Sequence, residues 1–308
     1  DRLIHALPVF HTHGLFVAVN VALLSGTTMI YMPRFDADAV IAALPRATAM
    51  MGVPTFYTRL IDHSGLTREA CVNMRLFVSG SAPLLAETHA AWRARTGLAI
   101  LERYGMTETN MITSNPYDRE RRAGTVGFAL PGVSVRIVAP ESGAPIPPGE
   151  IGIIEVKGPN VFAGYWRMPE KTGQEFRPDG YFITGDLARF DEDGYVHIVG
   201  RAKDLVISGG FNVYPKEVEA EIDAIEGVLE SAVFGVPHAD FGEGVTAAVV
   251  PRPGAALSEQ AILAALGGRV AKFKAPKRVI LVESLPRNAM GKVQKAALRE
   301  AYKDIYRG

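Results

Sequence analysis

The 308-residue chain carries 33 lysines and arginines against 33 aspartates and glutamates, so it has no net charge. Nothing in this balance indicates the broad basic face that nucleic acid or an anionic membrane would require, while small anions stay allowed as ligands. A hydrophobic content of 48% suffices for two or three domains with sizeable cores. The longest apolar run, residues 15–24, is shorter than the ~20 residues of a membrane-spanning helix. The single cysteine, Cys71, permits no intrachain disulfide and indicates a reducing compartment, so we expect a cytoplasmic protein.

The first part of the chain, to about residue 105, alternates apolar strand-like runs with helical stretches. Helical periodicity is clearest over residues 36–44, 55–64 and 84–96. Strands interleaved with helices predict an α/β layer on a largely parallel sheet.

The remainder divides into two further parts. Between about 124 and 200 short alternating segments, separated by glycine and proline, indicate a small antiparallel β subdomain. From residue 201 helices and strands mix again, as in a compact α+β domain. We expect a helix that opens at Pro215 and another over about 258–272.

Lys292 stands in the loop "PRNAMGKVQK" and, in this prediction, opens the last helical stretch. A solvated side chain at a helix start is one interpretation. Because the helix dipole already places positive charge there, a lysine that meets an incoming anion is the other.

The stretch "LERYGMTET", residues 101–109, follows a predicted strand and has the composition of a ligand loop. Tyr104 offers a flat face to a base, Thr107 a hydroxyl to a phosphate, and Glu108 a carboxylate to Mg²⁺, which prefers oxygen ligands. An ordinary polar turn is an equally good interpretation of this stretch alone.

Upstream, "VSGSAPL" gives a second predicted strand end followed by small residues that let a ligand approach the backbone. A plain strand-to-helix turn would have the same composition. Ligands of open α/β sheets bind at the carboxyl ends of strands, and both stretches occupy such ends, which favours a binding site. The small residues are Gly80, Ser81 and Ala82.

Two later stretches, residues 180–204 and 204–219, indicate more closely which kind of ligand would bind. We expect Asp186 at a strand end, where a carboxylate can chelate a ribose diol, and Arg201 next to a domain boundary. The Gly209-Gly210 pair permits conformations or close approaches that other residues forbid, although a hairpin turn would also explain it.

Six stretches in this order resemble the signature motifs of the adenylate-forming superfamily of acyl-CoA synthetases, luciferases and peptide-synthetase adenylation domains. The similarity covers practically the whole chain. They are "LPVFHTHGL", "GSAPL", "YGMTET", "YFITGD", "GRAKDLVISGGFNVYPKEVE" and "PRNAMGKVQK".

The resemblance implies an AMP-forming ligase that activates a carboxylate with ATP and Mg²⁺ and passes the acyl group to a thiol such as coenzyme A. It implies three parts: the C-terminal part of a large α/β domain (1–123), a small β-barrel-like subdomain (124–200) and a mobile α+β lid (201–308) that swings about a hinge near Lys203. The family's glycine- and hydroxyl-rich phosphate loop does not occur in this sequence. We therefore expect the chain to be a portion of a longer enzyme.

The resemblance also assigns roles to individual residues. Lys292 would bridge the substrate carboxylate and the α-phosphate, Thr107 would contact that phosphate, and Glu108 would hold the metal. Gly209 and Gly210 would line the pantetheine tunnel. The nucleotide would contact Gly80, Ser81, Ala82, Tyr104, Gly105, Thr107, Asp186 and Arg201.

The acyl pocket would be lined in part by His11, Ser81 and Met106. The stretch "VPTFYTRL" resembles malonyl-CoA synthetases. Its Arg59 would bind a second carboxylate of the substrate, so malonate is the favoured substrate. A surface arginine on an amphipathic helix is the alternative. His11 and His13 lack a third ligand at suitable spacing, so a zinc site is not expected.

Three alternatives stay open. The enzyme could act on another short or medium acid, it could load a carrier protein in place of coenzyme A, or the chain could be a noncatalytic nucleotide-binding module. Lys292, in its glycine-flanked loop, would also suit acylating and deacylating enzymes as regulatory partners.

Overall fold

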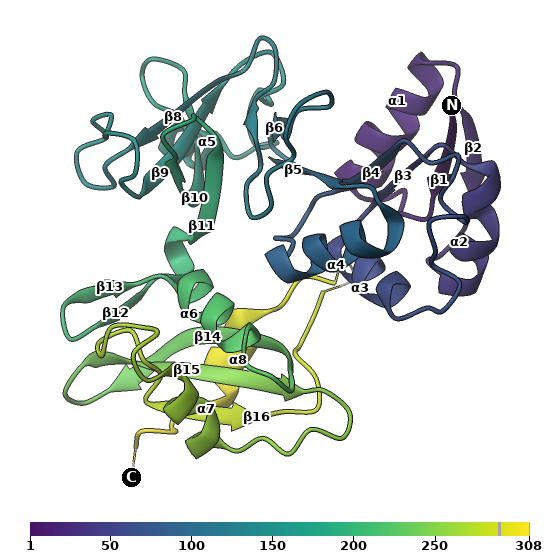
Figure 1. The fold of residues 1–308 in the computed structure, drawn as a ribbon. Coiled ribbons are helices and arrows are strands. Elements are labelled where there is room, and N and C mark those ends of the chain that lie inside the picture. The colour runs from purple at the N-terminus through teal and green to yellow at the C-terminus, as the bar shows by residue number, and fades with distance from the viewer. Residues whose placement is uncertain (289–290, 308) are drawn as a thin grey trace. The chain divides into compact units, whose positions relative to one another are not determined.

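The computed structural model describes residues 1–288 and 291–307, and they form two compact units (Figure 1). Unit 1 comprises Asp1–Thr184 and Ala188–Ile198, and unit 2 comprises Gly185–Leu187 and Val199–Gly308. Every helix in the described part of the chain is too short or too polar to cross a bilayer.

Unit 1 begins with a seven-stranded sheet in the order β2-β1-β3-β4-β5-β6-β7, in which the first five strands are parallel and the last two antiparallel. The strands are β1 (Arg2–His5), β2 (Thr28–Tyr31), β3 (Ala49–Gly52), β4 (Leu76–Ser79), β5 (Ile100–Met106), β6 (Asn110–Ser114) and β7 (Phe128–Ala129).

Helices connect the parallel strands. The three regions of helical periodicity form α2, α3 and α4, and Asp36 caps α2 by accepting a hydrogen bond from the Ala39 amide at 2.9 Å. The helical segments are a π-helix (His13–Val19), α1 (Asn20–Leu24), α2 (Ala37–Ala43), a 3₁₀ turn (Leu44–Arg46), α3 (Pro54–Ile61) and α4 (Ala86–Thr96).

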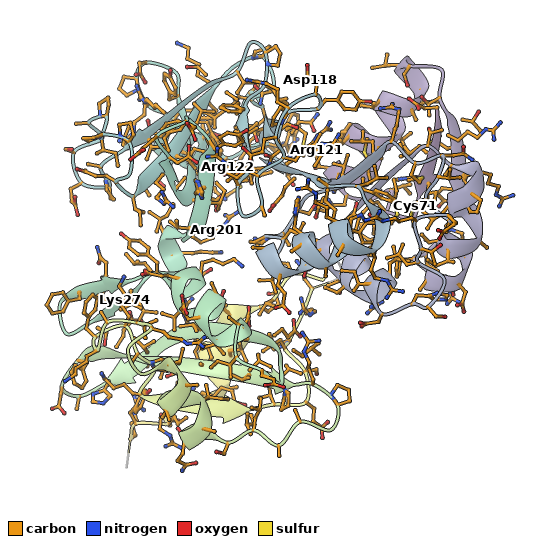
Figure 2. The ribbon with its side chains drawn as sticks, in the orientation of Figure 1. Cys71, Asp118, Arg121, Arg122, Arg201 and Lys274 are labelled. Atoms are coloured by element: carbon orange, nitrogen blue, oxygen red, sulfur yellow. The ribbon has the colours of Figure 1, made fainter. Side chains whose placement is uncertain are left out.

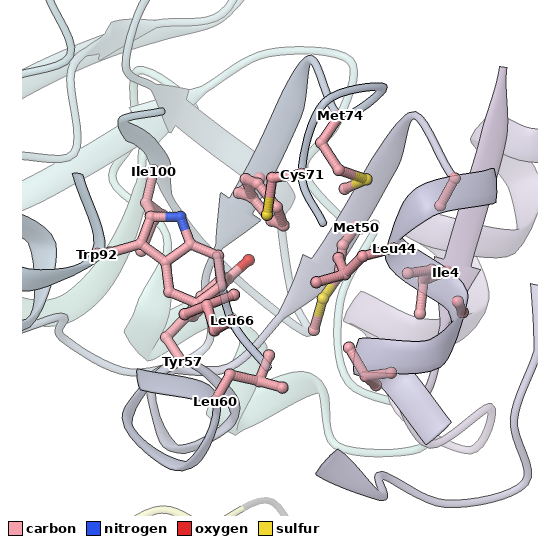
Figure 3. Close-up of a cluster of buried hydrophobic side chains, with 14 of the residues drawn as sticks. Ile4, Leu44, Met50, Tyr57, Leu60, Leu66, Cys71, Met74, Trp92 and Ile100 are labelled. Atoms are coloured by element: carbon pink, nitrogen blue, oxygen red, sulfur yellow. The ribbon is translucent and has the colours of Figure 1, made fainter. Parts of the chain in front are cut away.

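Aliphatic side chains and a group of large aromatic ones fill the core of this α/β layer (Figure 3). Tyr57, Phe77 and Trp92 are fully buried and meet edge to face, with centroids 4.8–6.5 Å apart. The buried Tyr57 hydroxyl donates to the Val78 carbonyl at 2.6 Å. Cys71 lies in the same core, where burial raises the pKa of its thiol to about 11. The thiol is therefore protonated and shielded at neutral pH.

The antiparallel β subdomain predicted from residue 124 forms a four-stranded sheet, in the order β11-β10-β9-β8. Glu155 is fully buried there and pairs with Arg136 and Arg177. The elements are β8 (Ser134–Val138), β9 (Gly152–Lys157), α5 (Pro169–Glu175), β10 (Phe182–Phe190) and β11 (Val196–Arg201).

Unit 2 is built on a sheet in the order β13-β12-β15-β14, with β16 parallel to β15. The helix predicted over 258–272 ends earlier, because Gly267 and Gly268 follow its last residue. The elements are a 3₁₀ turn (Ala202–Asp204), β12 (Val206–Ser208), β13 (Phe211–Val213), α6 (Pro215–Asp223), β14 (Val228–His238), β15 (Gly242–Pro251), α7 (Glu259–Leu266), β16 (Arg278–Leu281) and α8 (Lys295–Ala301).

Candidate functional site

Ser79, the last residue of β4, pairs with Glu102 in the parallel ladder, and a Cβ on the following Gly80 would lie 3.6 Å from the Arg103 carbonyl oxygen of β5. The small residues that follow β4 and the stretch "YGMTET" of β5 therefore lie at one edge of the sheet, as the sequence predicted. The prediction that "YGMTET" is a loop was wrong in part, because Tyr104–Met106 belong to β5 and pair with β6. A Cβ on Gly105 would lie 2.1 Å from the Asn110 carbonyl oxygen, so only glycine allows this tight return.

Ser81 has a left-handed backbone, with φ of 70°, which is uncommon for a residue other than glycine. Its hydroxyl lies 3.1 Å from Nδ1 of the buried His13, which holds the side chain in place. Burial, and then the nearby cation of Arg103, lower the pKa of His13 to about 4. The imidazole at this strand end is therefore neutral at pH 7.

Arg103, in β5, is a partly buried cation that the sequence predictions did not include. Its Nε lies 3.3 Å from the Ser114 hydroxyl, and burial lowers the pKa of the guanidinium. Among the described residues, no carboxylate lies within salt-bridge distance of it. Its position beside Tyr104, at the carboxyl end of a central strand, was the signal that could have identified it.

Arg59 differs from Arg103 in its surroundings. It lies in the last turn of α3, and its side chain is exposed, as in the surface alternative.

His11 and Met106 are half-buried, and His11 Nδ1 accepts from the His13 amide at 3.3 Å. The structure thus ties His11 to His13 and places Met106 at the end of β5.

Thr107 and Glu108 occupy the turn between β5 and β6. Thr107 is exposed, while Glu108 is half-buried and its Oε1 lies 3.1 Å from the Tyr165 hydroxyl. The described residues contain no group of three or more histidine, cysteine or acidic side chains that could hold a metal alone.

Asp186 lies in the middle of β10, not at a strand end as predicted, and only 4% of its surface is exposed. Its Oδ1 is 2.7 Å from Nε of Arg201, at the end of β11 (Arg201 is labelled in Figure 2). Both residues belong to unit 2. The strand position is fixed by pairing in the four-stranded sheet, which the sequence pattern did not show.

Lys292 precedes the last helix, which begins only at Lys295, so the predicted helix-start position was wrong. A bridge between Arg287 and Val293 closes the loop, and the Asn288 side chain accepts from the Lys292 amide at 2.9 Å. Within this motif, residues 289 and 290 lie outside the described residues.

The surroundings of Lys292 lower the pKa of its ammonium group. Loss of hydration contributes most, followed by the cation of Arg201, while Asp186 acts in the opposite direction. All three residues belong to unit 2. Unit 2 therefore gathers a lysine, an arginine and a carboxylate in one region.

Gly209 and Gly210 form the turn of the β12–β13 hairpin, with φ of 59° and 80°. Positive φ at both central positions is typical of a tight two-residue turn and explains the glycine pair. Lys203 lies in the 3₁₀ turn before β12.

Comparison with known proteins gives two family matches. The family described as AMP-binding enzyme matches residues 1–166, and the AMP-binding enzyme C-terminal domain matches residues 217–292. The chain belongs to the AMP-binding enzyme family. The resemblance to the adenylate-forming superfamily and the predicted fold class are thereby confirmed.

Relatives within the AMP-binding family include ligases for several acids. Feruloyl-CoA synthase of Amycolatopsis sp. is 39% identical over 98% of this chain and 62% of its own length. Malonate–CoA ligase of Arabidopsis thaliana is 36% identical over 98% of this chain and 54% of its own. The sequence of MatB from Rhodopseudomonas palustris, whose crystal structure was solved with ATP bound, is 67% identical to this chain. The structural match covers 99% of this chain and 61% of the MatB chain, with a TM-score of 0.98. The chain thus spans between 54% and 62% of the length of these relatives.

Proposed function

We propose that the enzyme containing this chain is a malonate–CoA ligase, which forms malonyl-adenylate from malonate and ATP and then transfers the malonyl group to coenzyme A. Membership of the AMP-binding family supports the adenylation chemistry. Malonate–CoA ligases of Arabidopsis thaliana and mouse are among the relatives, and the MatB structure was solved with ATP.

The observation that carries the choice of malonate is Arg103. A cation removed from water is costly unless an anion meets it, and a guanidinium can bind a carboxylate through two parallel hydrogen bonds. A dicarboxylate would present one carboxylate to the nucleotide and the other to Arg103. We assign this role to Arg103 ahead of Arg59, because the Arg59 side chain is exposed.

The nucleotide would bind along the β4–β5 edge. The residues after β4, Gly80, Ser81 and Ala82, would contact the adenine together with Tyr104 and Gly105. Neutral His13 supports this reading, because it fixes the strained Ser81 without adding charge beside the base.

The ribose diol would be held by Asp186, whose carboxylate is already oriented by Arg201 at 2.7 Å. Thr107 would contact the α-phosphate, and Lys292 would stabilise the negative charge that develops there during attack by the carboxylate. Release of pyrophosphate leaves the acyl-adenylate.

Mg²⁺ would bind at Glu108. One protein carboxylate fits this ion, which commonly takes one or two carboxylates and completes its shell with phosphate oxygens and water. The ion would screen the phosphate charges, while the chain itself orients the nucleotide.

The second half-reaction would need Lys292 to leave the site before the thiol enters. We assign the hinge to Lys203 and the pantetheine tunnel to the hairpin glycines Gly209 and Gly210, whose lack of side chains leaves room. Acylation of Lys292 would remove the charge that the first step uses, so enzymes that acylate and deacylate this lysine are proposed regulatory partners. The cytoplasm is the proposed compartment, although the mouse relative carries the word mitochondrial in its name.

The test is malonate-dependent release of pyrophosphate by the full-length enzyme, with acetate, benzoate and ferulate as competitors. Malonate should be preferred, and Arg103→Met should raise its KM at least tenfold while the Arg59→Ala control changes it little. A preference for ferulate would keep the adenylation chemistry and refute the dicarboxylate assignment. Absence of pyrophosphate release with every acid would refute the proposed enzyme.

A further inference from the structure

A tyrosine hydroxyl lies between two carboxylates beside the turn that carries Glu108. The Tyr165 hydroxyl is 3.1 Å from Oε1 of Glu108 and 2.7 Å from Oε2 of Glu175. Glu175 is the last residue of α5, and Tyr165 precedes that helix, so the contact joins segments far apart in sequence. All three residues belong to unit 1.

The chemistry of this contact is asymmetric. A phenol has one hydrogen and can donate it to only one of two ionised carboxylates at a time. Lys171, with its Nζ 4.1 Å from the Tyr165 ring centroid, brings a positive charge to the same cluster.

The backbone around Tyr165 is tied to the Glu108 turn. The Phe162 amide donates to the Glu108 carbonyl at 2.8 Å, and the Asn160 side chain donates to the Thr109 carbonyl at 2.8 Å. The Tyr165 amide in turn donates to the Thr172 hydroxyl at 3.0 Å. These hydrogen bonds therefore hold the segment that carries Tyr165 next to the turn that carries Glu108.

We propose that Tyr165 is a positioning residue for the metal carboxylate: it occupies Oε1 of Glu108 and so turns Oε2 toward the cation that accompanies ATP. Glu175 competes for the same hydrogen and adds negative charge near the cation. This inference rests on the proposed function, which assigns the cation to Glu108. Partners that orient metal ligands in this way typically change metal affinity by about 10–100-fold when removed.

The experiment measures Mn²⁺ binding to the full-length enzyme by electron paramagnetic resonance, in the presence of α,β-methylene ATP. Tyr165→Phe should raise the Mn²⁺ dissociation constant by about tenfold, and Glu175→Gln should raise it by a smaller factor, because it removes charge but frees the phenol for Glu108. Tyr181→Phe is the matched control, since this hydroxyl bonds Ser134 at 2.7 Å and should leave the constant unchanged. The Mg²⁺ dependence of pyrophosphate release should move in parallel.

Glu108→Gln separates this inference from the proposed function. If Glu108→Gln weakens Mn²⁺ binding and Tyr165→Phe does not, the positioning role is refuted and the metal assignment stands. If Glu108→Gln leaves binding unchanged, the metal assignment itself fails, and the inference fails with it. If Tyr165→Phe does not fold, Thr172→Val decides: it removes the hydroxyl that accepts from the Tyr165 amide, and an unchanged constant for that variant overturns the proposal.

Discussion

Asp223 should make unit 2 less stable as the pH rises toward neutrality. It is the last residue of α6, and its Oδ1 is buried without a hydrogen-bond partner among the described residues. Burial raises the pKa of this carboxyl from 3.8 to about 7, with a smaller contribution in the same direction from Glu219 and Glu230 and opposing ones from Ser231 and Lys216.

The sign follows from proton binding. Because the pKa is higher in the folded chain, the folded state binds more protons than the unfolded state between pH 3.8 and about 7. Stability therefore falls as the pH rises through this window, and the full loss is reached above pH 7. A pKa difference of this size corresponds to about 4 kcal/mol, and partial solvent exposure of Asp223 reduces the expected loss to about 2 kcal/mol.

Asp223→Asn removes the charge and keeps the shape of the side chain. We expect the variant to stabilise unit 2 by about 2 kcal/mol at pH 8, with the gain vanishing near pH 4, where the wild-type carboxyl is already protonated. Asp240→Asn, at an exposed position of the same unit, is the control and should show no gain.

The assay must report on unit 2 alone. Both tryptophans, Trp92 and Trp166, belong to unit 1, so their fluorescence is unsuitable. Hydrogen exchange of the β14 amides, followed by mass spectrometry and corrected for intrinsic rates at each pH, gives the opening free energy of unit 2. A difference between variant and wild type that is the same at pH 5 and pH 8, or a loss of stability at pH 8, would refute the reasoning.

Three further predictions concern catalysis and the core. Lys292→Ala should lower adenylation by at least about a hundredfold, yet leave thioester formation from preformed acyl-adenylate largely intact; equal losses in the two half-reactions would contradict the division of labour. Arg287→Ala removes the contact to the Gly291 carbonyl that closes the lysine loop, and should lower adenylation by about tenfold without changing the KM for coenzyme A. Tyr57→Phe removes the hydroxyl that donates to the Val78 carbonyl and should destabilise unit 1 by about 1–2 kcal/mol in urea unfolding followed by tryptophan fluorescence; an unchanged midpoint would show that the bond contributes nothing.

Local patterns predicted most of the secondary structure. The periodic stretches at 36–44 and 84–96 became helices, because capping residues and helix formers agree with the apolar spacing there. The helix predicted over 258–272 stopped at Leu266, since two glycines end it, even though Val270 and Phe273 beyond them keep the apolar spacing and pack on the same core.

Tertiary pairing decided what the sequence could not show. Tyr104 was expected in a loop, but the partner strand β6 extends β5 through it. Arg59 was chosen from its motif and Arg103 was not considered, because the sequence alone does not show which side chains the fold buries. The contact of Tyr165 with Glu108 and Glu175 joins three separate segments, so no local pattern contains it.

The burial of Cys71 makes the two-unit chain well suited to single-molecule spectroscopy (Figures 2 and 3). With its pKa raised to about 11, the native thiol should not react with maleimide dyes at neutral pH. Cysteines introduced at exposed positions, for example Ser142 in unit 1 and Glu226 in unit 2, could then be labelled without removing the native one. In the full-length enzyme, energy transfer between the two dyes would report changes in the distance between the units when substrates are added.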